Sequence, residues 1–187
     1  LEVSLGTDGL LRCTVSYMPY RTGSYPAGFQ GTEVASLADL VQAAQDGLSQ
    51  KTIPIRITNA SLTVDDMNRA LQQAGGSWLL CQLNQDGTAI TVTPQGGLTQ
   101  EQALKRLSDT EKLARQVYQE TVTASMEERE QAEALYTYLT ETVSYDFRYY
   151  GKPGEMPYDS TTAYGALQDH LAICSGYAQA FQLLLEQ

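Results

Sequence analysis

The sequence predicts an α+β protein in two parts, a small N-terminal α/β module at residues 1–96 and a helical part at residues 97–187. Strand-like and helix-like patterns alternate as far as Pro94-Gln95-Gly96-Gly97, and mainly helical periodicity continues after this glycine-rich segment. Apolar residues make up 42% of the chain and charged residues 18%, which is typical of a protein with a packed core.

Six segments of the N-terminal module have strand or helix patterns in the order β-α-β-α-β-β: Leu10–Tyr17, Leu37–Ala44, Thr52–Ile57, Val64–Ala74, Trp78–Leu83 and Thr88–Thr93. Residues 20–31 are rich in Gly, Pro, Ser and Tyr, which predicts an irregular loop. Pro54 lacks a backbone N–H and favours an edge position for its strand. Asp86-Gly87 lies between the last two runs and is typical of a hairpin turn.

The helical part begins with two segments that fit capping boxes, Thr99-x-x-Gln102 and Ser125-x-x-Glu128. We expect a helix after each of them, the first interrupted near Ser108. An aromatic loop follows over residues 145–158, then a short helix ending at Leu167. The last apolar stripe predicts a helix that begins near Cys174.

The charge of the chain excludes several partners. A net charge of −10 disfavours nucleic acid and anionic membrane surfaces. No apolar run approaches the roughly 20 residues of a membrane helix. Few charges and many Gln, Thr and Tyr favour an extracellular or cell-surface location. Because the chain starts at Leu1 without an initiator Met, we expect a mature or excised fragment.

The three cysteines have no metal-site spacing, and no residue implies a cofactor. Cys13 and Cys81 lie in apolar, strand-like runs, where they are either buried free thiols or a disulfide. Cys174 is the odd thiol, which suits a reactive role.

Cys174 has the surroundings that a nucleophile needs. A thiol at a helix N-terminus experiences the positive end of the helix dipole, which favours the nucleophilic thiolate. The small neighbours Ser175, Gly176 and Ala178 leave room for a substrate carbonyl. The alternative is a small apolar side chain packed in a core, the usual role of a lone cysteine.

Three motifs carry a resemblance to a known family: Val143-Ser144-Tyr145-Asp146, Ala163-Tyr164-Gly165-Ala166-Leu167 and Cys174-Ser175-Gly176-Tyr177-Ala178. Together they resemble the front half of a bacterial transglutaminase-like domain, over roughly residues 126–187. That superfamily includes papain-like peptidases and uses a Cys-His-Asp triad.

The resemblance implies a thiol acyl-transferase or a peptide-bond-hydrolysing domain with Cys174 as nucleophile and no cofactor. Its substrate would be a protein or peptide, with a cell-wall peptide as one candidate. The triad His and Asp would lie on strands beyond Gln187, so we expect residues 1–187 to be a truncated, inactive domain. Asp146 is expected to anchor its loop rather than to act as the triad acid.

Several residues have a second interpretation. Tyr158, Tyr164 and Tyr177 are candidates for substrate binding, or they take part in ordinary aromatic packing. The only histidine, His170, precedes the nucleophile helix and is expected to be a solvated loop residue or a helix cap rather than the base. The rival function is a non-catalytic binding or scaffold module.

The last helix also predicts an association surface. If its apolar stripe lacks cover within the chain, it should associate with another copy. The stripe contains Tyr177, Phe181, Leu184 and Leu185.

Overall fold

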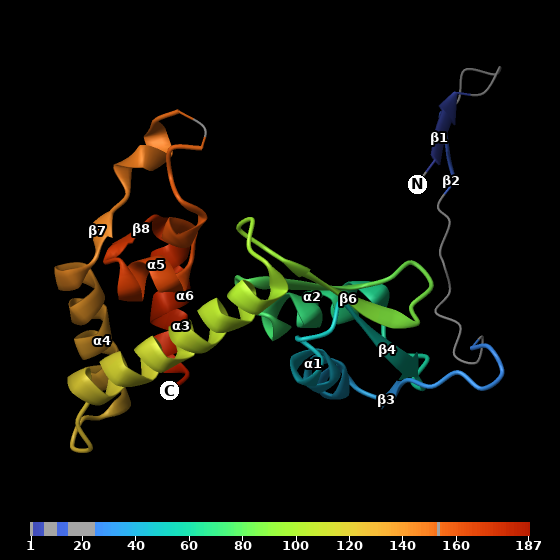
Figure 1. Cartoon of the computed structure of the whole chain (residues 1–187), viewed down its shortest axis with the longest axis horizontal. Coiled ribbons are helices and arrows are strands. Elements are labelled where there is room, and N and C mark those ends of the chain that lie inside the picture. The colour runs from blue at the N-terminus through green and yellow to red at the C-terminus, as the bar shows by residue number, and fades with distance from the viewer. Residues whose placement is uncertain (1, 6–10, 15–24, 153) are drawn as a thin grey trace.

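The computed structural model describes residues 2–5, 11–14, 25–152 and 154–187. It has a mixed α+β fold with two lobes along one long helix, α3 (Gln100–Thr121; Figure 1). Ahead of the first lobe, β1 (Glu2–Leu5) pairs with β2 (Leu11–Thr14) in an antiparallel hairpin. The remainder of the expected strand Leu10–Tyr17 lies outside the described residues.

The first lobe is a four-stranded sheet with two helices on one face. The strand order is β3-β4-β6-β5, with bounds Thr32–Val34, Thr52–Ile57, Ala89–Pro94 and Leu79–Leu83. The helices are α1 (Leu37–Asp46) and α2 (Val64–Ala74), and their N-caps are Ser36 and Thr63. Along β4 every second residue is buried, so one face of the sheet meets the helices and the other faces solvent.

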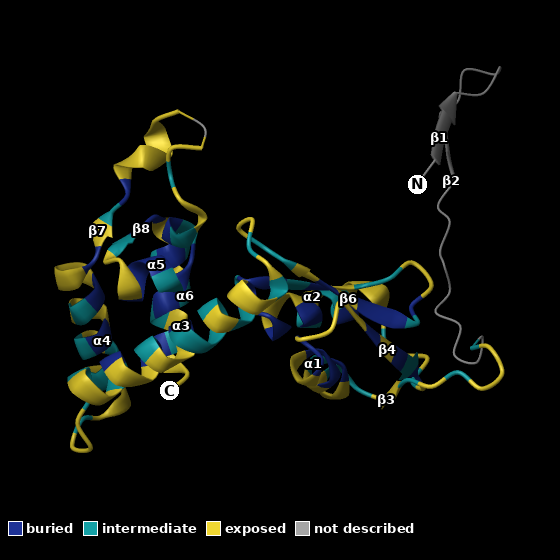
Figure 2. Ribbon diagram, in the orientation of Figure 1, coloured by how far each residue is buried: buried dark blue, intermediate teal, exposed yellow. Residues whose placement is uncertain are grey.

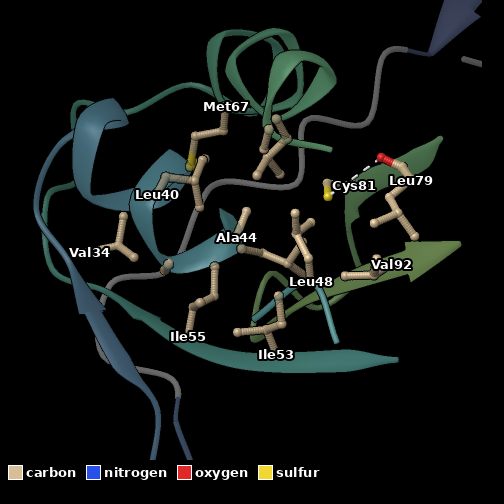
Figure 3. Packing of buried hydrophobic residues seen from close by; sticks show 14 of the residues in the cluster. Val34, Leu40, Ala44, Leu48, Ile53, Ile55, Met67, Leu79, Cys81 and Val92 are labelled. Carbon is tan, nitrogen blue, oxygen red and sulfur yellow. Dashed lines mark hydrogen bonds between the residues drawn. The ribbon is translucent and has the colours of Figure 1, made fainter. Parts of the chain in front are cut away.

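The core of this lobe is formed where the helices meet the sheet (Figure 3). Ile53, Ile55 and Ile57 of β4 pack beneath Leu40 and Met67 of the two helices. The pattern β-α-β-α-β-β is therefore confirmed for residues 32–94. The first strand of this order is β3, however, and not the run at Leu10–Tyr17.

The prediction that Pro54 places its strand at the sheet edge is wrong. β4 lies inside the sheet, parallel to β3 and antiparallel to β6. The backbone N–H of Ile55 donates to Thr88 on the β6 side, so the nitrogen of Pro54 faces the other side. There β3 begins only opposite Ile55, and no ladder hydrogen bond is lost.

Helix α3 is continuous across Ser108, contrary to the expected interruption, and Thr99 caps it in a capping box as predicted. The start of α4 (Glu128–Thr142) differs from prediction, because Glu127 and not Ser125 is the N-cap. The hydroxyl of Ser125 lies 3.1 Å from that of Thr123, while the backbone N–H of Glu127 donates to Glu130.

The second lobe packs α4 and two further helices against the second half of α3. The remaining elements are β7 (Ser144–Tyr145), the 3-10 turns η1 (Phe147–Tyr150) and η2 (Tyr158–Thr161), α5 (Ala163–Gln168), β8 (Leu171–Ala172) and α6 (Cys174–Leu185). Most described residues of the loop between β7 and α5 are exposed (Figure 2).

The apolar stripe of α6 is covered within the chain. Leu184 is fully buried in the core of the second lobe, and Tyr177 and Phe181 pack against that core. Only Leu185 stays half exposed. This cover removes the basis on which self-association was expected. Self-association itself stays a prediction.

The two lobes meet around Trp78, which is 2% exposed. Its indole N–H donates to Thr110 of α3, and its ring contacts Tyr158 and Tyr164 edge to face. Arg106 of α3 lies 4.0 Å from the ring centroid of Tyr164. The core of the first lobe continues into α3, so separate folding of residues 1–96 stays a prediction.

Candidate functional site

Cys174 is the first residue of α6, as the sequence predicts, and its side chain is exposed. The two residues before it, Ala172 and Ile173, are buried, so the chain emerges from the core at the thiol. The N-cap residue, Ile173, has no polar side chain and makes no side-chain cap hydrogen bond. The thiol therefore lies at the positive end of a 12-residue helix whose first backbone N–H groups have no partner within the helix.

A short parallel strand pair brings Tyr145 to the thiol. β7 pairs with β8 so that Tyr145 lies opposite Ala172, two residues before Cys174. Hydrogen bonding to Tyr150 raises the pKa of Tyr145 to about 12, with further contributions from burial and from the charges of Tyr150 and Cys174. The phenol is therefore protonated at neutral pH and hydrogen-bonded to Tyr150.

Asp146 fixes the corner that follows Tyr145. Its carboxylate, 2% exposed, accepts hydrogen bonds from Arg148 Nε and Nη2 at 2.9 Å and from Ser160 Oγ at 2.7 Å. The hydrogen bonds from Arg148 are the main reason that the pKa of Asp146 is lowered to about 2. These contacts fit the expected anchoring role.

The turn η2 holds the start of α6 from the other side. Ile173 N donates to Ser160 O, and Ser175 Oγ donates to Thr161 O, both at 2.9 Å. A Cβ atom at Gly176 would lie 2.9 Å from the carbonyl oxygens of Ser160 and Thr162, a distance too short for any side chain. The glycine in Cys-Ser-Gly-Tyr-Ala thus lets α6 lie against η2.

The three candidate substrate-binding tyrosines make contacts within the protein. The hydroxyl of Tyr158 donates to Ser77 O at 2.7 Å, Tyr164 packs between Trp78 and Arg106, and the Tyr177 hydroxyl donates to Val143 O. Tyr158 keeps about a third of its surface exposed and lines a cleft between the lobes, which Cys174 does not line. Their role in binding substrate stays a prediction.

The loop after β7 contains a group of exposed aromatic side chains. Tyr145, Phe147, Tyr149 and Tyr150 have neighbouring ring centroids 5.2–6.5 Å apart. Phe147 is 74% exposed and Tyr150 71%. The sequence predicts an aromatic loop over residues 145–158 but not which of its rings pack together. The proximity of Tyr145 to Cys174 depends on a two-residue strand pair that leaves no local pattern.

His170 ends α5. It is exposed and has a φ of +53°, the left-handed conformation that usually follows a helix C-terminus and favours glycine. Its carbonyl accepts from Ser144 N at 2.9 Å and joins this turn to β7. Of the two expected roles, the exposed loop residue fits His170, and the C-cap of α5 is Asp169.

Neither the scan against protein-family models nor the search of curated proteins found a match to this chain. Within the part of the chain that the structure describes, no helix combines the length and apolar character needed to cross a membrane. The same residues contain no group of three or more His, Cys, Asp or Glu side chains placed to hold a metal ion.

The two described thiols should differ strongly in alkylation rate. Cys81 is free, 1% exposed, and burial raises its pKa from 9.0 to about 11, which leaves roughly 100-fold less thiolate than an ordinary cysteine. We expect iodoacetamide at pH 7.5 to label Cys174 at least ~100-fold faster, as measured by peptide mapping. Equal alkylation rates of Cys81 and Cys174 in the folded chain would contradict the conclusion that one thiol is buried and the other exposed. Unfolding in urea should make the rates equal.

Asp146 should make the free energy of unfolding depend on pH in the acidic range. Because its pKa in the folded chain lies below the ordinary value of 3.8, it contributes stability above about pH 4 that is lost as the pH falls toward 2. Asp146→Asn should lower the free energy of urea unfolding by about 3 kcal/mol at pH 7 and by less at pH 3. Asp86→Asn, at an exposed turn, is the control. A loss of the same size at both pH values would contradict the role of the carboxylate.

Proposed function

We propose that this chain carries the nucleophile part of a transglutaminase-like thiol acyl-transfer or peptide-bond-hydrolysing domain, with Cys174 as nucleophile. The observation that carries the proposal is the exposed thiol at the first residue of α6, held between Tyr145 on one side and η2 on the other. The motifs Tyr-Gly-Ala-Leu and Cys-Ser-Gly-Tyr-Ala also support it, because their glycines allow α5 and α6 to approach η2 closely.

In the proposed reaction the sulfur of Cys174 attacks an amide carbonyl, on a glutamine side chain or in a peptide bond. The S–C bond forms, the C–N bond breaks, and ammonia or an amine leaves with a proton. Water or a second amine then releases the acyl group. The base that takes the thiol proton, a His oriented by an Asp, is proposed to lie on strands after Gln187.

Two donors near the sulfur suit the negative charge that develops on the carbonyl oxygen. One is the backbone N–H of Cys174, which lacks a partner within the helix. The other is the Tyr145 hydroxyl, which is protonated at neutral pH and would exchange its hydrogen bond with Tyr150 for one to the substrate oxygen. The thiol, the dipole of α6 and these donors all act on the same reacting atoms.

The substrate is proposed to be a protein or peptide, with a cell-wall peptide as one candidate and an extracellular or cell-surface location. The exposed rings of Phe147 and Tyr150 support a peptide substrate, since they offer apolar area around Tyr145, which lies opposite Ala172 in the β7–β8 pair.

A second candidate is a non-catalytic binding or scaffold module. The observation that favours it is the cleft between the lobes, which is large and is not lined by Cys174. In that case residues 126–187 would serve to form one wall of the cleft rather than to carry out a reaction.

The test compares residues 1–187 with a longer protein that continues past Gln187. Each is assayed for release of ammonia and incorporation of a labelled amine into a glutamine donor, and for cleavage of a peptide panel. Activity in the longer protein only supports the proposal. No activity in either favours the scaffold. Activity of residues 1–187 that His170→Ala abolishes would place the base at His170 and overturn the proposed triad.

A further inference from the structure

A cleft of about 990 Å³ lies between the two lobes. Its walls are one face of α1, the C-terminal end of α2 with the turn to β5, the middle of α3 and the C-terminal half of α6. The volume is at the upper end of the range for ligand pockets, and junctions between lobes are common places for them.

The charged groups of the cleft are acidic. Glu111 and Glu186 line it, and no Lys, Arg or His of the described residues does. Arg106, on the same helix as Glu111, pairs with Asp159 at 3.0 Å and stacks on Tyr164. The cleft therefore disfavours phosphate and carboxylate ligands and suits neutral or basic ones.

Three side-chain amides of the cleft are available to a ligand. Gln45 on α1 and Gln72 and Gln73 on α2 are exposed. Among the described residues none of the three side chains has a hydrogen-bond partner. Each offers two N–H donors and a carbonyl acceptor, which is the complement that a peptide backbone requires.

The apolar part of the cleft is aliphatic. Val41, Leu80, Leu107 and Leu183 are half-buried in its walls. The aromatic rings offer little open face to the cleft, because Trp78 is 2% exposed and the Tyr158 ring, about a third exposed, packs against Trp78 and Gly96. Sugar rings are held by stacking on open aromatic faces, so this wall suits aliphatic side chains of a peptide better than a glycan.

We propose that the cleft between the lobes binds an extended peptide segment. The segment would be rich in aliphatic side chains, and its net charge would be zero or positive. Aliphatic side chains would contact the leucines, backbone amides would pair with the glutamines, and a basic group would face Glu111 or Glu186. This site goes beyond the proposed function and does not depend on the reactivity of Cys174.

Trp78 allows a direct test, because it is the only tryptophan of the chain and lies in the cleft wall. Its emission is followed while residues 1–187 are titrated with a capped hexapeptide of alternating leucine and alanine that carries one lysine. A matched glutamate peptide and maltohexaose are the comparison ligands. We expect saturation by the lysine peptide below ~5 mM and at least tenfold weaker binding of the glutamate peptide.

Substitutions of residues that line the cleft test whether the peptides bind there. Combined Glu111→Gln and Glu186→Gln should weaken the lysine peptide about tenfold, and combined alanine replacement of Gln45, Gln72 and Gln73 should weaken both peptides at least tenfold. Glu141→Gln, at an exposed position of α4 outside the cleft, should change neither. Three results would each overturn the proposal: no saturation by the lysine peptide, saturation unchanged in the cleft variants, or saturation by maltohexaose alone.

Discussion

Replacing Cys174 with alanine should lower the turnover of an amide donor by at least ~10⁴-fold in a protein that continues past Gln187. The reason is that covalent catalysis ends with the loss of the sulfur, while the rest of the site stays in place. Cys174 is exposed, so alanine leaves no cavity and the fold should be unchanged. Initial rates at saturating donor, with far-ultraviolet circular dichroism to confirm folding, measure the effect.

The matched control removes the other described thiol. Cys81→Ala lies in the core of the first lobe, far from the reacting atoms, and should retain the rate at temperatures well below unfolding. A Cys174→Ala protein that keeps more than about a tenth of the rate would remove the thiol from the mechanism.

Trp78→Ala should lower the free energy of unfolding by about 3–5 kcal/mol, the largest stability effect that we expect. The indole is 2% exposed and connects the lobes through Thr110, Tyr158 and Tyr164. Its removal leaves a cavity between α3 and η2, and Arg106 loses one of its two aromatic neighbours.

Urea unfolding followed by circular dichroism measures this effect without the tryptophan signal. Phe147→Ala is the matched control, because that ring is 74% exposed and should cost less than about 1 kcal/mol. A Trp78→Ala loss as small as the control would show that the lobes do not depend on this contact.

Local patterns predicted much of the fold. The periodic runs that became α1 and α2 and the hairpin across Gly87 carry complete signals, because caps, stripes and turn residues lie within a few positions. The start of α6 at Cys174 was predicted in the same way. β3 was not, since three residues without alternation become a strand only by pairing with β4.

The arrangement of the site could not be predicted from local patterns. Tyr145 reaches the thiol because β7 and β8 pair over two residues, and Trp78 joins the lobes through residues about 30 to 90 positions away. Pairings over such distances leave no periodic trace. The sequence predicted which residue is the nucleophile candidate, and the structure adds what lies around it.

The most direct test of Cys174 as nucleophile is the mass of the acyl-enzyme. The longer protein is mixed with a glutamine donor peptide, quenched in acid during turnover and digested, and the peptide that contains Cys174 is weighed. We predict a mass increase equal to the donor acyl group on Cys174, removed by hydroxylamine and absent after Cys174→Ala. Turnover with no acyl group on Cys174, or with the group on another residue, would contradict the account.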